Sequence, residues 1–128
     1  MTREQKRADL VYKVVTNIKD KKKIKDDFSS IALRFPALLR SAGLVQALAF
    51  VAARDDEAHR TFLYKFSEIL LKLNGTNKAD GNAFDKLFED AREAPLPQYM
   101  RLSREALAVS DWFKRFAQSI LDAEHEGA

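Results

Sequence analysis

The sequence contains no cysteine and few residues that reverse a chain. Among its 128 residues, four are glycine and three are proline. The absence of cysteine excludes disulfide bonds, thiolate nucleophiles and cysteine-ligated zinc sites from this sequence. A β-sheet protein needs turn residues at each strand reversal, so the scarcity of glycine and proline favours a fold made of helices.

Long apolar runs are also missing. No stretch approaches the roughly 20 apolar residues that span a bilayer, and the first residues, Met1 to Arg7, are too polar for a secretion signal. We therefore expect a cytoplasmic protein without a membrane partner. The length suits one domain with one core, so the sequence predicts a single domain over residues 1–128.

Positive charge is concentrated near the start of the chain. The formal net charge is +3 at pH 7, yet residues 1–25 hold nine Lys or Arg against three Asp or Glu, and residues 79–128 hold six against ten. A basic end that meets a polyanion would explain this asymmetry, as would an unevenly charged solvated surface. Charge alone favours the second interpretation.

Helical patterning begins at the first residues. Thr2 and Gln5 have the spacing of a capping box, and apolar residues then recur every three or four positions. This pattern predicts a helix from about 2 to 20. A basic connector follows, and its lysines are candidate phosphate contacts that would make binding sensitive to salt. These lysines are Lys21, Lys22, Lys23 and Lys25.

Pro36 interrupts the next apolar stripe. A proline inside a helix removes one hydrogen bond and clashes with the preceding turn. We therefore expect a break near Phe35 and a short helix that starts at Pro36 and ends at Gly43, a suitable left-handed cap. Residues 44–54 are apolar on most sides, which is typical of a helix that is central or covered by another chain.

The second half of the chain predicts three more helices. Residues 55–57 are acidic and predict a cap and a favourable charge for a helix that ends at Asn74 and Gly75. Residues 74–82 form the clearest loop. Asn82 is suited to cap a short helix, which the two prolines in residues 95–97 stop.

The last helix has the most regular pattern. Its apolar residues between Leu102 and Ile120 step alternately by four and three, which is heptad spacing. This seam fits either the spine of an intramolecular bundle or a ridge that binds a partner, and the first is favoured. Residues 124–128 are expected to fray. Together the patterns predict an all-α fold, a compact single-domain bundle of about six helices.

The sequence shows no constellation for catalysis or metal binding. His59 could share a helix face with Asp55, but no further ligands occur at suitable spacing. Consecutive acidic residues at 55–57 point about 100° apart and cannot converge on magnesium. No glycine-rich phosphate loop or nucleophile elbow is present. We therefore predict no catalytic residues, no metal, no cofactor and no enzymatic activity, with a metal-dependent hydrolase as the remote alternative.

Contact with nucleic acid is the remaining functional hypothesis. Further candidate phosphate contacts lie at helix ends or faces: Arg40, Arg54, Lys114 and Arg115. Ordinary roles compete with this one. Asp111 is spaced for an i,i+4 ion pair with Arg115, and Trp112, which could stack on a base, is better placed to pack beside the apolar seam. No RNA-recognition, KH or zinc-finger signature is present.

Two blocks of residues resemble the small subunit of the Cmr complex, the type III-B CRISPR effector. The first is residues 35–50, FPALLRSAGLVQALAF, and the second is residues 99–107, YMRLSREAL, continuing to WFKRFA at 112–117. The basic first helix, the length and the all-helical pattern are also similar to that family. Small subunits of type III-A complexes share the helical character, so the subtype stays open.

The resemblance implies a non-catalytic helical bundle that stacks in copies beside the backbone subunits of the effector complex. The other Cmr subunits, neighbouring copies, guide RNA and target RNA would be its partners, and the backbone subunits would cleave the target. Because basic surface residues build the family's RNA groove, the resemblance extends an RNA-binding role to Arg40, Arg54, Lys114 and Arg115. The cluster from Lys21 to Lys25 rests on charge alone. The alternative is a helical protein–protein adaptor that does not touch RNA.

Overall fold

Helices account for most of the described backbone. The computed structural model describes residues 1–76 and 82–123 of the chain, and no strand occurs among them. Six helices follow one another in the order α1 (Arg3–Lys19), α2 (Lys22–Ala42), α3 (Leu44–Ala52), α4 (Glu57–Leu73), α5 (Ala83–Glu93) and α6 (Leu96–Ile120). The predicted all-α class and the predicted number of helices are confirmed.

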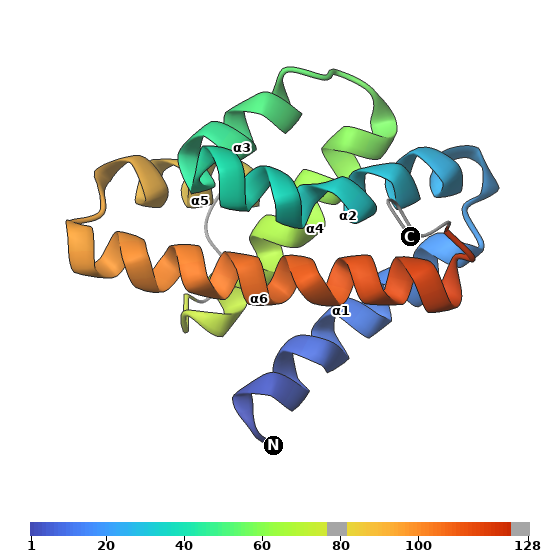
Figure 1. The fold of residues 1–128 in the computed structure, drawn as a ribbon, viewed down its shortest axis with the longest axis horizontal. Helices are drawn as coiled ribbons and strands as arrows, with labels where there is room; N and C mark the ends of the chain where they lie inside the picture. The colour runs from blue at the N-terminus through green and yellow to red at the C-terminus, as the bar shows by residue number, and fades with distance from the viewer. Residues whose placement is uncertain (77–81, 124–128) are drawn as a thin grey trace.

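The longest helix, α6, crosses the front of the molecule in Figure 1, with α2 running beside it. α6 packs on α2 and on α1, while α4 contacts α2 and α5. α1 and α4 both cross α6 obliquely (Figure 1). One face of α6 is therefore covered by α1, α2 and α4, and its other face is open to solvent.

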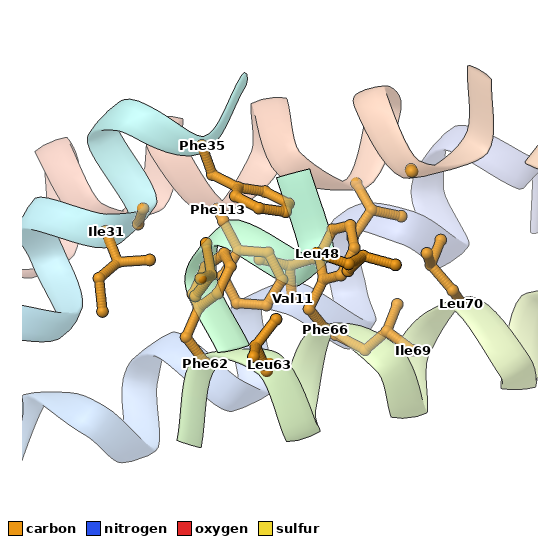
Figure 2. Packing of buried hydrophobic residues seen from close by; sticks show 14 of the residues in the cluster. Val11, Ile31, Phe35, Leu48, Phe62, Leu63, Phe66, Ile69, Leu70 and Phe113 are labelled. Carbon is orange, nitrogen blue, oxygen red and sulfur yellow. The ribbon is translucent and has the colours of Figure 1, made fainter. Parts of the chain in front are cut away.

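Phenylalanines from α2, α4 and α6 form the centre of the core. The rings of Phe35 and Phe62 lie 5.1 Å apart, and those of Phe62 and Phe113 also lie 5.1 Å apart. Figure 2 shows Phe35, Phe62, Phe66 and Phe113 gathered at one point between these helices. Aromatic pairs in such tilted or edge-on geometry add about 1 kcal/mol each beyond the burial of apolar area. The cluster fixes α6 against the bundle.

The heptad seam of α6 lies inside the bundle. Ala106, Val109 and Phe113 are fully buried, and Leu102 is almost so. Towards the end of the seam, the partly buried Phe116 and Ile120 pack against the core. The interpretation of this seam as an intramolecular spine is confirmed. In the described residues, no helix is both long enough and apolar enough to cross a membrane.

The predicted break near Phe35 is wrong. α2 continues without interruption through Pro36, and no separate helix begins there. The cost of the proline is the one hydrogen bond that it cannot donate and the local clash that it causes. Phe35 and Leu39, on either side of it, are buried in the core, and this packing holds the helix on both sides of the proline. The predicted end at Gly43 is confirmed, since its N–H bonds the carbonyl of Leu39 at 3.0 Å. The predicted left-handed cap is wrong, because Gly43 has φ 86° and ψ 167°, an extended conformation with positive φ that glycine adopts readily.

The predicted caps form. The N–H of Thr2 donates to Oε1 of Gln5 at 2.8 Å, and the N–H of Gln5 donates to Oγ1 of Thr2 at 3.1 Å. Asp56 caps α4, and Asn82 caps α5 by accepting from the N–H of Phe84 at 2.8 Å. These bonds satisfy backbone donors that have no partner inside their own helix.

The prolines in residues 95–97 have a second effect. α5 ends at Glu93, before these prolines as predicted. α6 already begins at Leu96, because a proline is tolerated in the first helical turn, where the missing N–H has no helical acceptor. Of the predicted loop 74–82, Asn74 and Gly75 follow the end of α4. Residues 77–81 and the predicted frayed tail 124–128 lie outside the described residues.

Candidate nucleic-acid interface

The eight predicted RNA-binding residues fall into two regions of the structure. One group lies where α2 and α4 begin, and comprises Lys21, Lys22, Lys23, Lys25 and Arg54. The other group lies on α2 and α6, and comprises Arg40, Lys114 and Arg115. The fold therefore does not join all eight residues into one surface, and the two regions differ in the acidic residues that surround them.

The first region contains the lysine corner, which we define as Lys21, Lys22, Lys23 and Lys25. The first three of these side chains are exposed and Lys25 is half-buried. The ammonium of Lys23 lies 3.8 Å from Oε1 of Glu57, which places the corner beside the start of α4. Asp20, Asp26 and Asp27 flank the corner in the sequence, so carboxylates surround it on both sides.

Arg54 lies in a cleft of about 250 Å³ between α2, α3 and the first turn of α4. Asp27 and His59 line the same cleft, and Asp55 forms an ion pair with Arg60 at 2.6 Å beside it. Residues 20–27 and 54–60, around the starts of α2 and α4, hold six cationic residues and six carboxylates. This near balance leaves little net attraction for a polyanion.

His59 is hydrogen-bonded to Asp56, one of these carboxylates. Its backbone N–H donates to Oδ1 of Asp56 at 2.9 Å, and its ring Nδ1 lies 2.7 Å from the same oxygen. These two hydrogen bonds, the backbone one first, hold the pKa of Asp56 below its ordinary value. Within residues 1–76 and 82–123, no group of three or more His, Asp or Glu side chains is arranged to hold a metal ion.

The second region is strongly basic. Positions 101, 104, 108, 111 and 115 fall within an arc of about 80° on a helix of 3.6 residues per turn. Arg101, Arg104 and Arg115 are exposed there, with the small side chain of Ala108 between them. We call the set of Arg40, Arg101, Arg104, Lys114 and Arg115 the α6 basic face.

The acidic residue on this face is engaged by α2. Asp111 forms an ion pair with Arg40 at 3.4 Å, and the predicted i,i+4 pair with Arg115 is not formed among the described residues. The guanidinium of Arg115 instead lies 5.1 Å from the ring centre of Trp112. Trp112 is partly buried against the core and lies 5.2 Å from Phe116, ring to ring, so its predicted packing beside the seam is confirmed.

Four arginines surround one buried carboxylate at one end of this face. We call them the arginine pocket: Arg3 and Arg7 of α1 with Arg101 and Arg104 of α6, around a cavity of about 470 Å³. Glu105, whose side chain is 5% exposed, forms ion pairs with both Arg3 and Arg7. Arg3 also donates to the carbonyl of Leu73 at 3.0 Å, at the end of α4. The pocket keeps a large excess of positive charge.

Sequence reasoning missed all four arginines of this pocket. For Arg101 and Arg104 a signal existed, because both lie in the second resemblance block and share a helical arc with Arg115. For Arg3 and Arg7 no local signal existed. Their proximity depends on α1 packing against α6, which brings Arg3 to Glu105 across 102 residues of sequence.

Comparisons with known proteins give a consistent result. The family model of the CRISPR-associated protein Cas_Cmr5 matches residues 3–120. The protein described as "CRISPR system Cmr subunit Cmr5" from Thermus thermophilus is 43% identical over 96 residues, which are 75% of this chain and 76% of that protein. A crystal structure of a CRISPR-associated Cmr5 family protein, also from Thermus thermophilus, superposes with a TM-score of 0.81 at 40% identity, covering 94% of this chain and 97% of that one.

Proposed function

Because the chain belongs to the CRISPR-associated Cmr5 family, we propose that it is a non-catalytic small subunit of a type III-B, Cmr-type RNA-guided effector complex. Its partners are the other Cmr subunits, neighbouring copies of itself, and the guide and target RNA. It acts as one helical domain by positioning RNA and supporting the assembly, in the cytoplasm, and it needs no cofactor.

The α6 basic face is the observation that carries the RNA contact. It presents Arg101, Arg104 and Arg115 to solvent on one side of a rigid helix, whose opposite side is fixed by the phenylalanine core. Guanidinium groups bind phosphate through paired hydrogen bonds. Arg40 and Lys114 extend the same face, while the lysine corner and Arg54 provide further contacts of lower net charge.

The non-catalytic role is supported by the partners of two titratable side chains, the buried Glu105 and the half-buried His59. Glu105 is held between Arg3 and Arg7, and His59 is bonded to Asp56. Both pairs serve the packing or capping of helices. Neither presents a free base beside a nucleophile, which is the geometry that acid–base or covalent catalysis requires.

The adaptor alternative has less support. It would need the apolar residues of α3 to be uncovered, but Leu44, Leu48 and Val51 are buried. On that helix, Ala49, Phe50 and Ala52 are exposed, but only Phe50, at 59%, is a large apolar side chain, which is less than the apolar patches that usually mark interfaces.

Purification of the tagged chain from its native host, with ultraviolet crosslinking, tests the proposal. We expect Cmr subunits and guide RNA to co-purify, and the crosslinks to fall on peptides of α6. Recovery of the Cmr subunits with guide RNA but without any crosslink to this chain would contradict the RNA contact and support the adaptor. Recovery without Cmr subunits would contradict the assembly itself.

A further inference from the structure

The arginine pocket opens onto the α6 basic face, because Arg101 and Arg104 belong to both. We propose that this pocket binds a phosphodiester group of an RNA strand, with Arg101 and Arg104 as the donors and with Glu105, Arg3 and Arg7 as the groups that shape it. The inference rests on the proposed RNA contact and adds to it the site and the chemical group that is bound.

The two pairs of arginines in the pocket have different roles. Arg3 and Arg7 are tied to Glu105, and this arrangement attaches α1 to α6. Arg101 and Arg104 are exposed at the rim of the pocket, and no ion pair or hydrogen bond engages either side chain among the described residues. Attachment of α1 therefore accounts for two of the four guanidinium groups, and two donors are left for a ligand.

The charge of the pocket selects an anion. Four guanidinium groups surround the single carboxylate of Glu105, so three positive charges are in excess. A cation would be repelled, and a neutral ligand would leave this charge uncompensated. Phosphate matches the planar fork of arginine, which can donate two parallel hydrogen bonds to two oxygens. The side chain of Asn74 lines the same cavity and adds an uncharged polar group.

The surroundings of the pocket favour a strand over a small ion. Arg104 also lines a groove of about 190 Å³ with Arg40, between α6 and the junction of α2 and α3. Beyond Ala108 the face continues to Arg115, about 21 Å from Arg101 along the helix at 1.5 Å per residue. A small anion would use the pocket alone, whereas a chain of phosphates would also use Arg40 and Arg115.

The lysine corner does not offer an equivalent site. Its lysines and Arg54 lie among six carboxylates in residues 20–27 and 54–60, whereas the arginine pocket is lined by four arginines and one carboxylate, Glu105. The difference in local charge is large, and nonspecific affinity for RNA follows the number of phosphates that are neutralised.

The test compares two variants that lose the same charge. R101Q/R104Q removes the proposed donors, and the control K13Q/R92Q removes two exposed cationic residues from α1 and α5 that belong to neither candidate region. Fluorescence anisotropy with a 5′-hydroxyl single-stranded RNA is measured over a range of salt concentrations, and circular dichroism verifies the fold of each variant. Since each phosphate contact on a single strand contributes about 0.7 to the slope of log K against log salt, we expect the slope to fall by about 1.4 for R101Q/R104Q and to stay unchanged for K13Q/R92Q.

Five outcomes distinguish the possibilities. An equal fall with a 5′-phosphorylated RNA supports the phosphodiester, while a fall seen only with the 5′-phosphate would overturn it in favour of a terminal phosphate. A wild-type slope in R101Q/R104Q refutes the binding of RNA in the pocket. The proposed function stays intact in that case if the chain still crosslinks to RNA in the assembled complex.

Unchanged RNA affinity of R101Q/R104Q combined with its failure to enter the complex would assign the pocket to an acidic partner protein. Absence of all RNA crosslinks to the chain would refute both proposals.

Discussion

Arg40 of α2 donates a hydrogen bond to Asp111 of α6, with Nη2 and Oδ1 3.4 Å apart. The two side chains are 56% and 42% exposed, so solvent screens the pair and it contributes less than about 1 kcal/mol to stability. Its larger effect is on the charge of the α6 basic face, because Asp111 partly neutralises the face at its centre and keeps Arg40 close to α6.

Replacement of Asp111 by asparagine should strengthen RNA binding. The variant keeps the shape of the side chain, removes a carboxylate from the basic face and releases the guanidinium of Arg40. We expect affinity for single-stranded RNA to rise about threefold at low salt, with the gain shrinking as salt screens the charges. Anisotropy titrations of D111N and of wild type at two salt concentrations measure this. A loss of affinity would mean that the pair positions Arg40 for binding.

Replacement of Glu105 by glutamine should affect stability and RNA affinity in opposite directions. The change leaves Arg3 and Arg7 without their buried partner. Removal of one member of a fully buried pair costs roughly 3–5 kcal/mol, and because the side chain of Arg3 is 50% exposed we expect a smaller loss of about 2 kcal/mol. The folded variant should nevertheless bind RNA more tightly, since the arginine pocket gains one unit of positive charge.

Urea unfolding measures the stability of E105Q, and anisotropy at a temperature where the variant is fully folded measures its affinity. The matched control is E68Q, which removes an exposed carboxylate 3.8 Å from Lys65 and should change neither quantity appreciably. Weaker RNA binding by folded E105Q would show that Glu105 supports binding by holding Arg3 and Arg7 in place, whereas unchanged binding would contradict the assignment of a phosphate to the pocket.

Local patterns predicted most of the helices, and the errors have a common cause. Capping at Thr2, Asp56 and Asn82 depends on side chains within three residues of the bonded N–H groups, so the sequence contains the whole interaction. The break expected at Pro36 does not occur, because packing of Phe35 against α4 outweighs the loss of the one backbone hydrogen bond that Pro36 cannot donate. Local propensity cannot report the strength of contacts between distant helices.

The candidate site was less predictable for the same reason. The lysine corner was chosen because its four lysines are neighbours in the sequence, yet the carboxylate of Glu57 that approaches it belongs to α4. The arginine pocket was not predicted from the sequence because Arg3 and Arg104 come from opposite ends of the chain. The distribution of charge along the sequence therefore overestimated the positive charge of the lysine corner and gave no indication of the positive charge of the arginine pocket.

The stability of α4 should depend on pH through its cap. Hydrogen bonds from His59 hold the folded pKa of Asp56 below its unfolded value, so the contribution of the ionised cap is complete above the unfolded pKa and is lost as the pH falls through the folded one. D56N keeps a capping side chain but cannot ionise. We expect wild type to be the more stable of the two at pH 7 and their midpoints of thermal unfolding to converge below about pH 4. A constant difference down to pH 2 would contradict this linkage.

Neutralisation of the lysine corner should weaken RNA binding less than its charge suggests. The variant K21Q/K22Q/K23Q/K25Q removes four positive charges, and if each lysine neutralised one phosphate the slope of log K against log salt would fall by about 2.8. The neighbouring carboxylates repel a strand, and one of them, Glu57, lies 3.8 Å from Lys23. We therefore expect the slope to fall by less than about 1, which is smaller than the effect of R101Q/R104Q even though twice the charge is removed. Anisotropy titrations of both variants on the same RNA decide between the two surfaces. A fall of the slope near 2.8 would make the lysine corner the principal RNA contact. A small fall of the slope leaves that role with the exposed arginines of α6.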